Sequence, residues 1–307
     1  MRSFVQTAVT ILVIVSFVFL IYWLWQRQPR SNQPQNQEPN TKQETQNNQP
    51  QDSFLNIKDG SIIASSPLKI SGKTQPNSKV LVFSNTFNDI ATIAQDGSYS
   101  LDENLTNGLN LISVVSLDKD FKQIQKQDIS LYLKSKNDAS DFTQTAAGNV
   151  TKIFQNTVTV STANGDLNVS TSSSTKYTLP TPPPSKSPQP KTSGPDIRVG
   201  DFIIALGTNS SDNSLTALQL TVIRDNKPTI SKTYSVVKLA SAVKQKIFSG
   251  TSIVDNKLIE FTLDKNAQIF SSDKKADEKA ITKNQTAIIF YAPQNQDNIA
   301  SLVYIYP

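Results

Sequence analysis

An uncharged apolar run close to the N-terminus most limits what this chain can fold into. It extends from Phe4 to Trp25, about 22 residues. Its polar interruptions are Gln6, Thr7, Thr10 and Ser16. At roughly 1.5 Å per residue, a helix of this length spans about 33 Å, enough to cross a hydrocarbon core of about 30 Å. The run therefore predicts one transmembrane helix over residues 4–25, through which the chain would contact the lipid bilayer.

The residues at the C-terminal end of the run indicate where the membrane ends. Tyr22, Trp23 and Trp25 are amphipathic aromatics of the kind that favour the membrane–water interface, and Arg27 follows them. We take these four as candidate membrane-interface residues. Two alternatives are a cleaved secretory signal and a buried soluble helix. A cleaved signal needs a shorter apolar core and a small-residue cleavage site, and the sequence shows neither.

The flanking charges do not orient the predicted helix. Arg2 and the terminal amine balance Arg27 and Arg30, so the positive-inside rule favours neither side. We expect the N-terminus inside, with residues 1–3 as a cytoplasmic stub, because the rest of the chain resembles exported protein. The predicted localisation is the bacterial cytoplasmic membrane, in a single-pass topology with the C-terminal domains outside.

The composition excludes many kinds of active site. The 307 residues include no cysteine and no histidine, so thiolate nucleophiles, cysteine-bound zinc and histidine general bases cannot occur. The net charge of +5 comes from lysines scattered along the chain, whereas nucleic-acid binding favours clustered cations with exposed aromatics. We therefore expect no enzyme activity, no cofactor, no metal and no nucleic-acid partner.

A polar segment separates the apolar run from the rest of the chain. Residues 26–52 are rich in glutamine, asparagine and proline, and they include no large apolar residue. Such a segment cannot bury enough surface to offset its chain entropy. It predicts a disordered linker that holds the following domains away from the lipid.

The character changes again over residues 53–136, where short apolar segments alternate with turn signals. The segments begin with FLNI at 54–57 and continue at regular spacing, which is typical of seven or eight strands in a β-sandwich. The string KISGKTQPNSKVLVF and the following DGSYSLDENLTNGLNLISVV resemble bacterial immunoglobulin-like domains, including the accessory domains of glucodextranase-type enzymes. That resemblance implies an immunoglobulin-like sandwich without catalytic residues.

Residues 145–228 predict a second all-β unit. GNVTKIFQNTVTVST and DIRVGDFIIALG resemble an uncharacterised family of small bacterial extracytoplasmic β-barrels. In that pattern turns are expected at Gly148, Gly165, Gly200, Asp201 and Gly207. The proline-rich stretch 179–195 is expected to be an inserted loop, with ligand binding by that loop as the alternative.

Residues 229–307 resemble a divergent second copy of this unit. GTSIVDNKLIEFTL at 250–263 parallels GNVTKIFQNTVTVST at 148–162, and QTAIIFYAPQNQDNIASLVYIYP parallels DFIIALGTNSSDNSLTALQLTVI. These parallels indicate an internal duplication. The stretch 234–247 fits either a helix or a strand. The whole chain is therefore predicted to be all-β after one N-terminal transmembrane helix, with an Ig-like sandwich and two small antiparallel β-barrel-like units.

Serine–lysine pairs and carboxylate pairs are the remaining candidates for chemistry. Ser-x-x-Lys recurs along the chain, as chance predicts in a chain rich in both residues, and Ser211-Asp212-Asn213 lies in an expected hairpin turn. The candidate serine–lysine pairs include Ser66/Lys69, Ser235/Lys238, Ser241/Lys244, Ser271/Lys274 and Ser272/Lys275. Asp118 with Asp120, and Asp138 with Asp141, could hold calcium but supply few ligands. Solvated turns are the better interpretation.

Two functions fit these observations. The first is a non-enzymatic surface stalk or interaction module that meets a cell-wall glycan or another envelope protein. The second is a carbohydrate-binding accessory subunit of an envelope complex that processes polysaccharides. The sequence itself names neither the ligand nor the partner.

Overall fold

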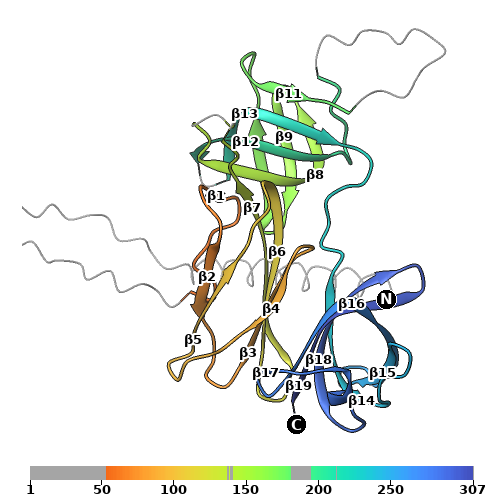
Figure 1. Cartoon of the computed structure of the whole chain (residues 1–307). Coiled ribbons are helices and arrows are strands. Elements are labelled where there is room, and N and C mark those ends of the chain that lie inside the picture. The colour runs from red at the N-terminus through yellow and green to blue at the C-terminus, as the bar shows by residue number, and fades with distance from the viewer. Residues whose placement is uncertain (1–52, 137, 139–140, 181–194, 212, 307) are drawn as a thin grey trace, which may run out of the picture. The chain divides into compact units, whose positions relative to one another are not determined.

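A computed structural model describes most of the chain after the predicted linker. The described residues are 53–136, 138, 141–180, 195–211 and 213–306. The predicted transmembrane run, its interface residues and the linker lie outside them. Within this part of the chain, no helix combines the length and hydrophobicity needed to cross a bilayer. The described strands form a sandwich module, a first barrel and a second barrel (Figure 1).

The sandwich module contains two sheets that share one apolar core. The larger sheet has the order β1-β7-β6-β3-β4, and the smaller one pairs β2 with β5. The strands are β1 (Ile62–Ile63), β2 (Leu68–Lys73), β3 (Lys79–Phe83), β4 (Asn88–Ala91), β5 (Ser98–Glu103), β6 (Gly108–Leu117) and β7 (Gln123–Leu133). Ile70 of β2 and Tyr99 of β5 are buried against Val82 of β3 and Ile112 of β6. The alternation in the sequence therefore predicted this sandwich correctly.

One predicted strand of the sandwich is wrong. Residues 54–57 form no strand, although Phe54 and Leu55 are buried in the core. The Phe54 carbonyl accepts a hydrogen bond from the Tyr99 hydroxyl, and the Asn56 N–H donates to the Ser71 carbonyl at 2.9 Å. The apolar side chains of this segment fill one end of the core without extending a sheet.

The first barrel is a ring of five strands with a sixth strand beside it. Its strands are β8 (Gln144–Phe154), β9 (Thr157–Thr162), β10 (Gly165–Ser170), β11 (Lys176–Thr178), β12 (Phe202–Ser211) and β13 (Ser214–Ile223). Four antiparallel pairs and one parallel pair, between β10 and β13, close the ring. An odd number of strands cannot close in a wholly antiparallel order, so the predicted antiparallel barrel needs this correction.

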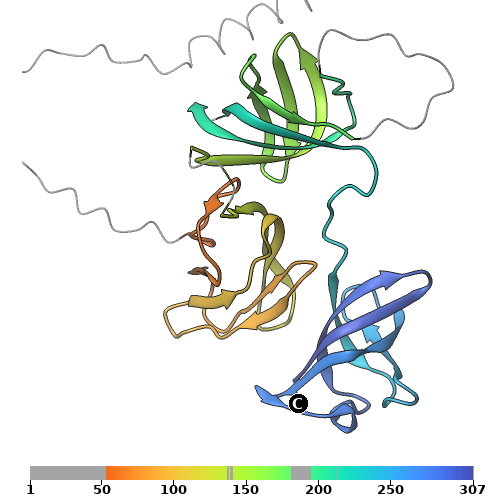
Figure 2. The same ribbon diagram turned by 45° about the horizontal axis from the view of Figure 1, so that its top comes forward.

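The second barrel repeats the same ring. Its elements are β14 (Thr233–Leu239), β15 (Ile247–Ser252), β16 (Leu258–Ser271), β17 (Lys274–Lys275), the short 3-10 helix η1 (Glu278–Ala280), β18 (Thr286–Gln294) and β19 (Asp297–Tyr306). The parallel pair of β16 with β19 closes it. Counted along the chain, the five ring strands of each barrel have the order 1-2-3-5-4, the Greek-key order of an OB-fold. Figure 2 shows the strands of the second barrel in blue from another side.

The shared order shows where the predicted sequence parallels fit and where they do not. The hairpin β18–β19 occupies the place of β12–β13, as one parallel predicts. The other parallel is displaced by one strand, because 250–263 form the hairpin β15–β16 whereas 148–162 form β8–β9. Both hairpins consist of two strands joined by a short connection that contains an asparagine, Asn156 or Asn256, so their local patterns look alike. The stretch 234–247, for which the sequence allowed either a helix or a strand, contains most of strand β14 and the loop that follows it, and no helix.

A fourth apolar cluster joins the sandwich module to the second barrel. From the sandwich it includes Leu81, Phe83, Val115 and Leu117, and from the barrel Val236, Ile288, Phe290 and Leu302. The rings of Phe83 and Phe290 meet edge to face with centroids 5.7 Å apart. Each of the strands β3 and β18 is therefore buried on both faces. One face packs in the core of its own module, and the opposite face packs in this joining cluster.

The joining cluster predicts a large effect of Phe290→Ala. Phe290 is fully buried, and truncation of such a ring leaves a cavity that costs about 3–5 kcal/mol. We expect that loss in the free energy of unfolding measured by denaturant titration. The matched control is Phe154→Ala, because Phe154 is 64% exposed and should change stability by about 0.5 kcal/mol or less. Equal effects of the two substitutions would contradict the joining cluster.

Candidate functional site

Most of the residues singled out in the sequence lie in structural positions or outside the described part. The candidate interface residues Tyr22, Trp23, Trp25 and Arg27 are outside it, as are residues 181–194 of the proline-rich loop. In three of the serine–lysine pairs, the serine hydroxyl bonds to a residue other than the paired lysine, and that of Ser235 lies 3.2 Å from the Tyr291 hydroxyl. The Ser66 hydroxyl accepts from the Leu105 N–H at 2.9 Å, and that of Ser241 accepts from the Ser249 N–H at 2.9 Å.

The candidate calcium ligands are turn residues. One Asp118 oxygen accepts the N–H groups of Asp120 and Lys122, both at 2.8 Å. Asp138 accepts the Ser135 N–H at 2.7 Å. Among the described residues, no group of three or more acidic side chains is placed to hold a metal ion. These carboxylates have the structural role that the solvated-turn interpretation predicts.

Two of the predicted turn glycines lie inside strands. Gly148 is in β8 and Gly207 is in β12, and a Cβ atom there would lie 2.0 Å and 1.9 Å from the carbonyl oxygens of Ser161 and Thr216. The strands approach too closely for any side chain at these positions. Gly200, by contrast, has a φ of +92° in the turn before β12, as expected.

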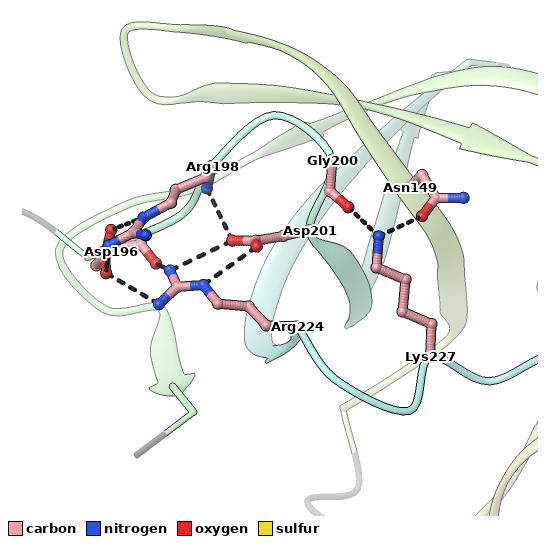
Figure 3. Close-up of polar contacts among 7 residues, drawn as sticks. All are labelled: Asn149, Asp196, Arg198, Gly200, Asp201, Arg224 and Lys227. Atoms are coloured by element: carbon pink, nitrogen blue, oxygen red, sulfur yellow. Dashed lines mark hydrogen bonds and ion pairs between the residues drawn. The ribbon is translucent and has the colours of Figure 1, made fainter. Parts of the chain in front are cut away.

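Asp201 has a larger role than a turn residue. Its carboxylate is buried and accepts the Arg198 N–H at 2.8 Å and the Arg224 Nε at 3.1 Å. Arg224 also contacts Asp196 at 3.0 Å, and Lys227 binds the Gly200 carbonyl (Figure 3). The hydrogen bond from Arg198 and the bond from Arg224 lower the pKa of Asp196. Both carboxylates of this network are paired with arginines, which joins the segment after the proline-rich insert to the end of β13, whereas Lys227 contacts only the neutral oxygens of Gly200 and Asn149.

The candidate binding site is a groove of about 790 Å³ lined by all three modules. The sandwich contributes residues of β6 and β7 to the groove. The first barrel contributes residues of β8 and β9, and the segment 229–234 runs along the groove. Its hydroxyl and amide side chains include Ser113, Gln123, Asn149, Ser161, Ser231 and Thr233. Phe83 and Phe202 also line it, but both are buried. The groove therefore offers hydrogen-bonding groups and no exposed phenylalanine ring for stacking.

Two asparagines of the sandwich hold the segment that borders the groove. Asn85 donates to the Thr229 carbonyl at 2.6 Å and accepts the Ser231 N–H at 2.7 Å. Asn88 accepts the Lys232 ammonium at 2.9 Å and the Ser301 hydroxyl at 3.0 Å. No local sequence signal marks this role, because asparagine is common in turns and the partners of Asn85 and Asn88 lie more than a hundred residues away.

Charged groups occur at two places in the groove. Lys126 forms an ion pair with Asp128 at 3.0 Å, and Asp128 also accepts the Ser113 hydroxyl. Lys232 is half-buried, and this burial lowers its pKa. Tyr234 donates to the Gln123 side chain at 3.1 Å, and burial raises the pKa of its hydroxyl. This arrangement can bind polar groups through hydroxyl, amide and charged side chains.

Glu103, at the end of β5, is a buried carboxyl that does not line the groove. It is 7% exposed, and its Oε1 atom has no hydrogen-bond partner. Burial, with a smaller contribution from the charge of Asp89, raises the pKa of Glu103 to about 7. The uncharged acid is therefore the stable form of Glu103 in the folded sandwich below neutral pH.

Comparisons with known proteins give likeness in structure only. No known protein family matches the sequence, and no curated protein shows significant similarity to it. Two solved structures each match 27% of this chain. One is described as fibronectin(III)-like modules of Clostridium thermocellum CbhA, with 18% identity, a TM-score of 0.23 and 95% of that chain covered. The other is CopC from Methylosinus trichosporium OB3b, with 16% identity, a TM-score of 0.22 and 97% covered. At these TM-scores the likeness supports no inference about function.

The buried acid predicts that stability falls as pH rises. An unfolded chain would lose the Glu103 proton near pH 4.5, whereas the folded chain holds it to about pH 7. The stabilisation from this proton is thus complete below pH 4.5 and is lost between there and pH 7. We expect Glu103→Gln to remove this loss in thermal unfolding measured across that range. Asp102→Asn, at the exposed neighbouring position, should retain it. A wild-type pH profile for Glu103→Gln would contradict the assignment.

Proposed function

We propose that this chain is a single-pass, membrane-anchored extracytoplasmic protein of the bacterial cell envelope. It acts as a non-enzymatic stalk that presents an interaction face to envelope polymers or proteins. The observation that carries this proposal is the groove bordered by three β-modules and held by Asn85 and Asn88. The apolar run and the polar linker support the tether, and the missing cysteine and histidine support the absence of catalysis.

A second candidate function is a carbohydrate-binding accessory subunit of an enzyme complex that processes envelope polysaccharides. The hydroxyl and amide groups along the groove favour it, because sugars are recognised through their own hydroxyl groups and such side chains both donate and accept hydrogen bonds. It differs from the stalk in one consequence. If the chain is an accessory subunit, deletion of its gene would lower the polysaccharide-processing activity of the complex. If the chain is a stalk, the deletion would leave that activity unchanged.

The proposed topology predicts that the domains are accessible from outside. Added protease should digest residues 53–307 on intact cells and leave a short N-terminal fragment of residues 1–30 in the membrane fraction. Immunoblotting with a tag at each end of the chain measures this. A cytoplasmic protein in the same cells is the control for lysis. Protection of the C-terminal tag on intact cells would contradict the topology.

The proposed groove predicts that one bulky substitution abolishes envelope binding. Ser161 is exposed and lines the groove, so Ser161→Trp should block it without disturbing the core. We expect the detergent-solubilised full chain to bind a purified cell-wall fraction in sedimentation, and the variant to lose most of that binding. Ser174→Trp places the same ring at an exposed position of the same barrel outside the groove, and should bind like the wild type. Equal binding of the two variants would exclude the groove.

A further inference from the structure

Lys232 is a partly desolvated cation without an ion-pair partner among the described residues. It lies in the segment that borders the groove and is half-buried. Its ammonium donates to the neutral Asn88 side chain at 2.9 Å. The ion pairs of the described residues involve other groups, and Asp264 acts on Lys232 only as a more distant charge. A cation in this position has lost part of its hydration without gaining a carboxylate in direct contact.

The other charges of the groove do not supply that counter-ion. The described lining residues include two lysines, Lys126 and Lys232, and one carboxylate, Asp128. Asp128 is engaged by Lys126 at 3.0 Å and by the Ser113 hydroxyl. Two positive charges and one negative charge leave an excess of one positive charge, and it belongs to Lys232. A ligand that brings an anionic group would restore the balance through a charge-assisted hydrogen bond.

The uncharged lining restricts which anionic ligands fit. It consists largely of hydroxyl and amide groups, including those of Gln123, Asn149 and Ser161, which match the hydroxyl groups of sugars. Single-stranded nucleic acid also carries anionic groups, but its binding sites depend on exposed aromatic rings for base stacking. Phe83 and Phe202 are buried, and the half-buried Tyr234 is the one other aromatic residue of the described lining, so the groove has no series of exposed rings.

We propose that the groove binds an anionic envelope polysaccharide, with the Lys232 ammonium pairing with a carboxylate or phosphate of the polymer while the hydroxyl and amide side chains bind its sugars. This assignment rests on the proposed interaction function and adds the charge class of the ligand. The anionic group takes the place of water at Lys232. A neutral polysaccharide leaves the cation uncompensated and binds more weakly.

The test compares defined polymers with the full chain in detergent. Polygalacturonate supplies carboxylates, dextran phosphate supplies phosphates on a sugar chain, and unmodified dextran is the neutral polymer. We expect Lys232→Gln to lower the affinity for the preferred anionic polymer about tenfold or more, the value of one hydrogen bond to a charged group. Lys232→Arg should retain most of the affinity. Lys238→Gln, at an exposed lysine on neighbouring β14, is the matched control and should bind like the wild type.

A second variant makes the test independent of the contact between Lys232 and Asn88. Lys126→Gln removes the partner of Asp128 and leaves an unpaired negative charge in the groove, so it should also weaken anionic binding. Calorimetry of thermal unfolding shows whether each variant remains folded. Binding of dextran as tight as that of both anionic polymers would overturn the proposal, as would wild-type affinity in Lys232→Gln and Lys126→Gln. Tighter binding of single-stranded DNA would overturn it in favour of nucleic acid.

The same experiment separates this proposal from the proposed function. If the wild-type chain binds the cell-wall fraction but the lysine variants bind equally well, the charge assignment fails and the interaction function stands. If the wild-type chain binds neither the wall fraction nor any defined polymer, both fail. Loss of wall binding in Ser161→Trp without any loss in the lysine variants would identify a neutral ligand in the groove, which also overturns the charge assignment.

Discussion

The packing of Phe83 against Phe290 and their apolar neighbours is the interaction on which the rest of the arrangement depends. Without it, β3 of the sandwich and β18 of the second barrel would each expose an apolar face to water. Burial of that surface holds the barrel against the sandwich, and the asparagine contacts near Thr229 and Lys232 then define the path of the joining segment. The groove exists because this packing brings the segment beside β6 and β7.

The polar groups divide into two classes with different consequences. Asp201 and Arg224 are buried or half-buried but mutually paired, so they stabilise the first barrel and leave nothing for a ligand. Lys232 is half-buried and paired only with an amide, which is why the groove is the better candidate for binding. Glu103 belongs to neither class. Its carboxyl is buried and its Oε1 atom has no hydrogen-bond partner, so its ionisation lowers stability as the pH rises from about 4.5 to about 7.

Much of the fold could be predicted from local patterns, and the failures share one cause. Segments such as KVLVF and GLNLISVVSL formed strands as expected, because alternation and turn residues are local signals. The predictions at 54–57 and for turns at Gly148 and Gly207 were wrong, because each depended on what another strand does nearby. The displaced parallel between 148–162 and 250–263 has the same origin, since a hairpin pattern does not say which hairpin of a barrel it forms.

The sequence by itself determined the all-β class of the domains that follow residue 52 and the exclusion of cysteine and histidine chemistry. It also showed that strands such as β3 and β18 are apolar on both faces, so both faces must be covered. Only the tertiary structure decided what covers them, because burial does not identify a partner. It also decided that the barrels close through parallel pairs and that Asn85, Asn88 and Lys232 meet at one groove. Contacts across more than a hundred residues leave no local pattern in the chain.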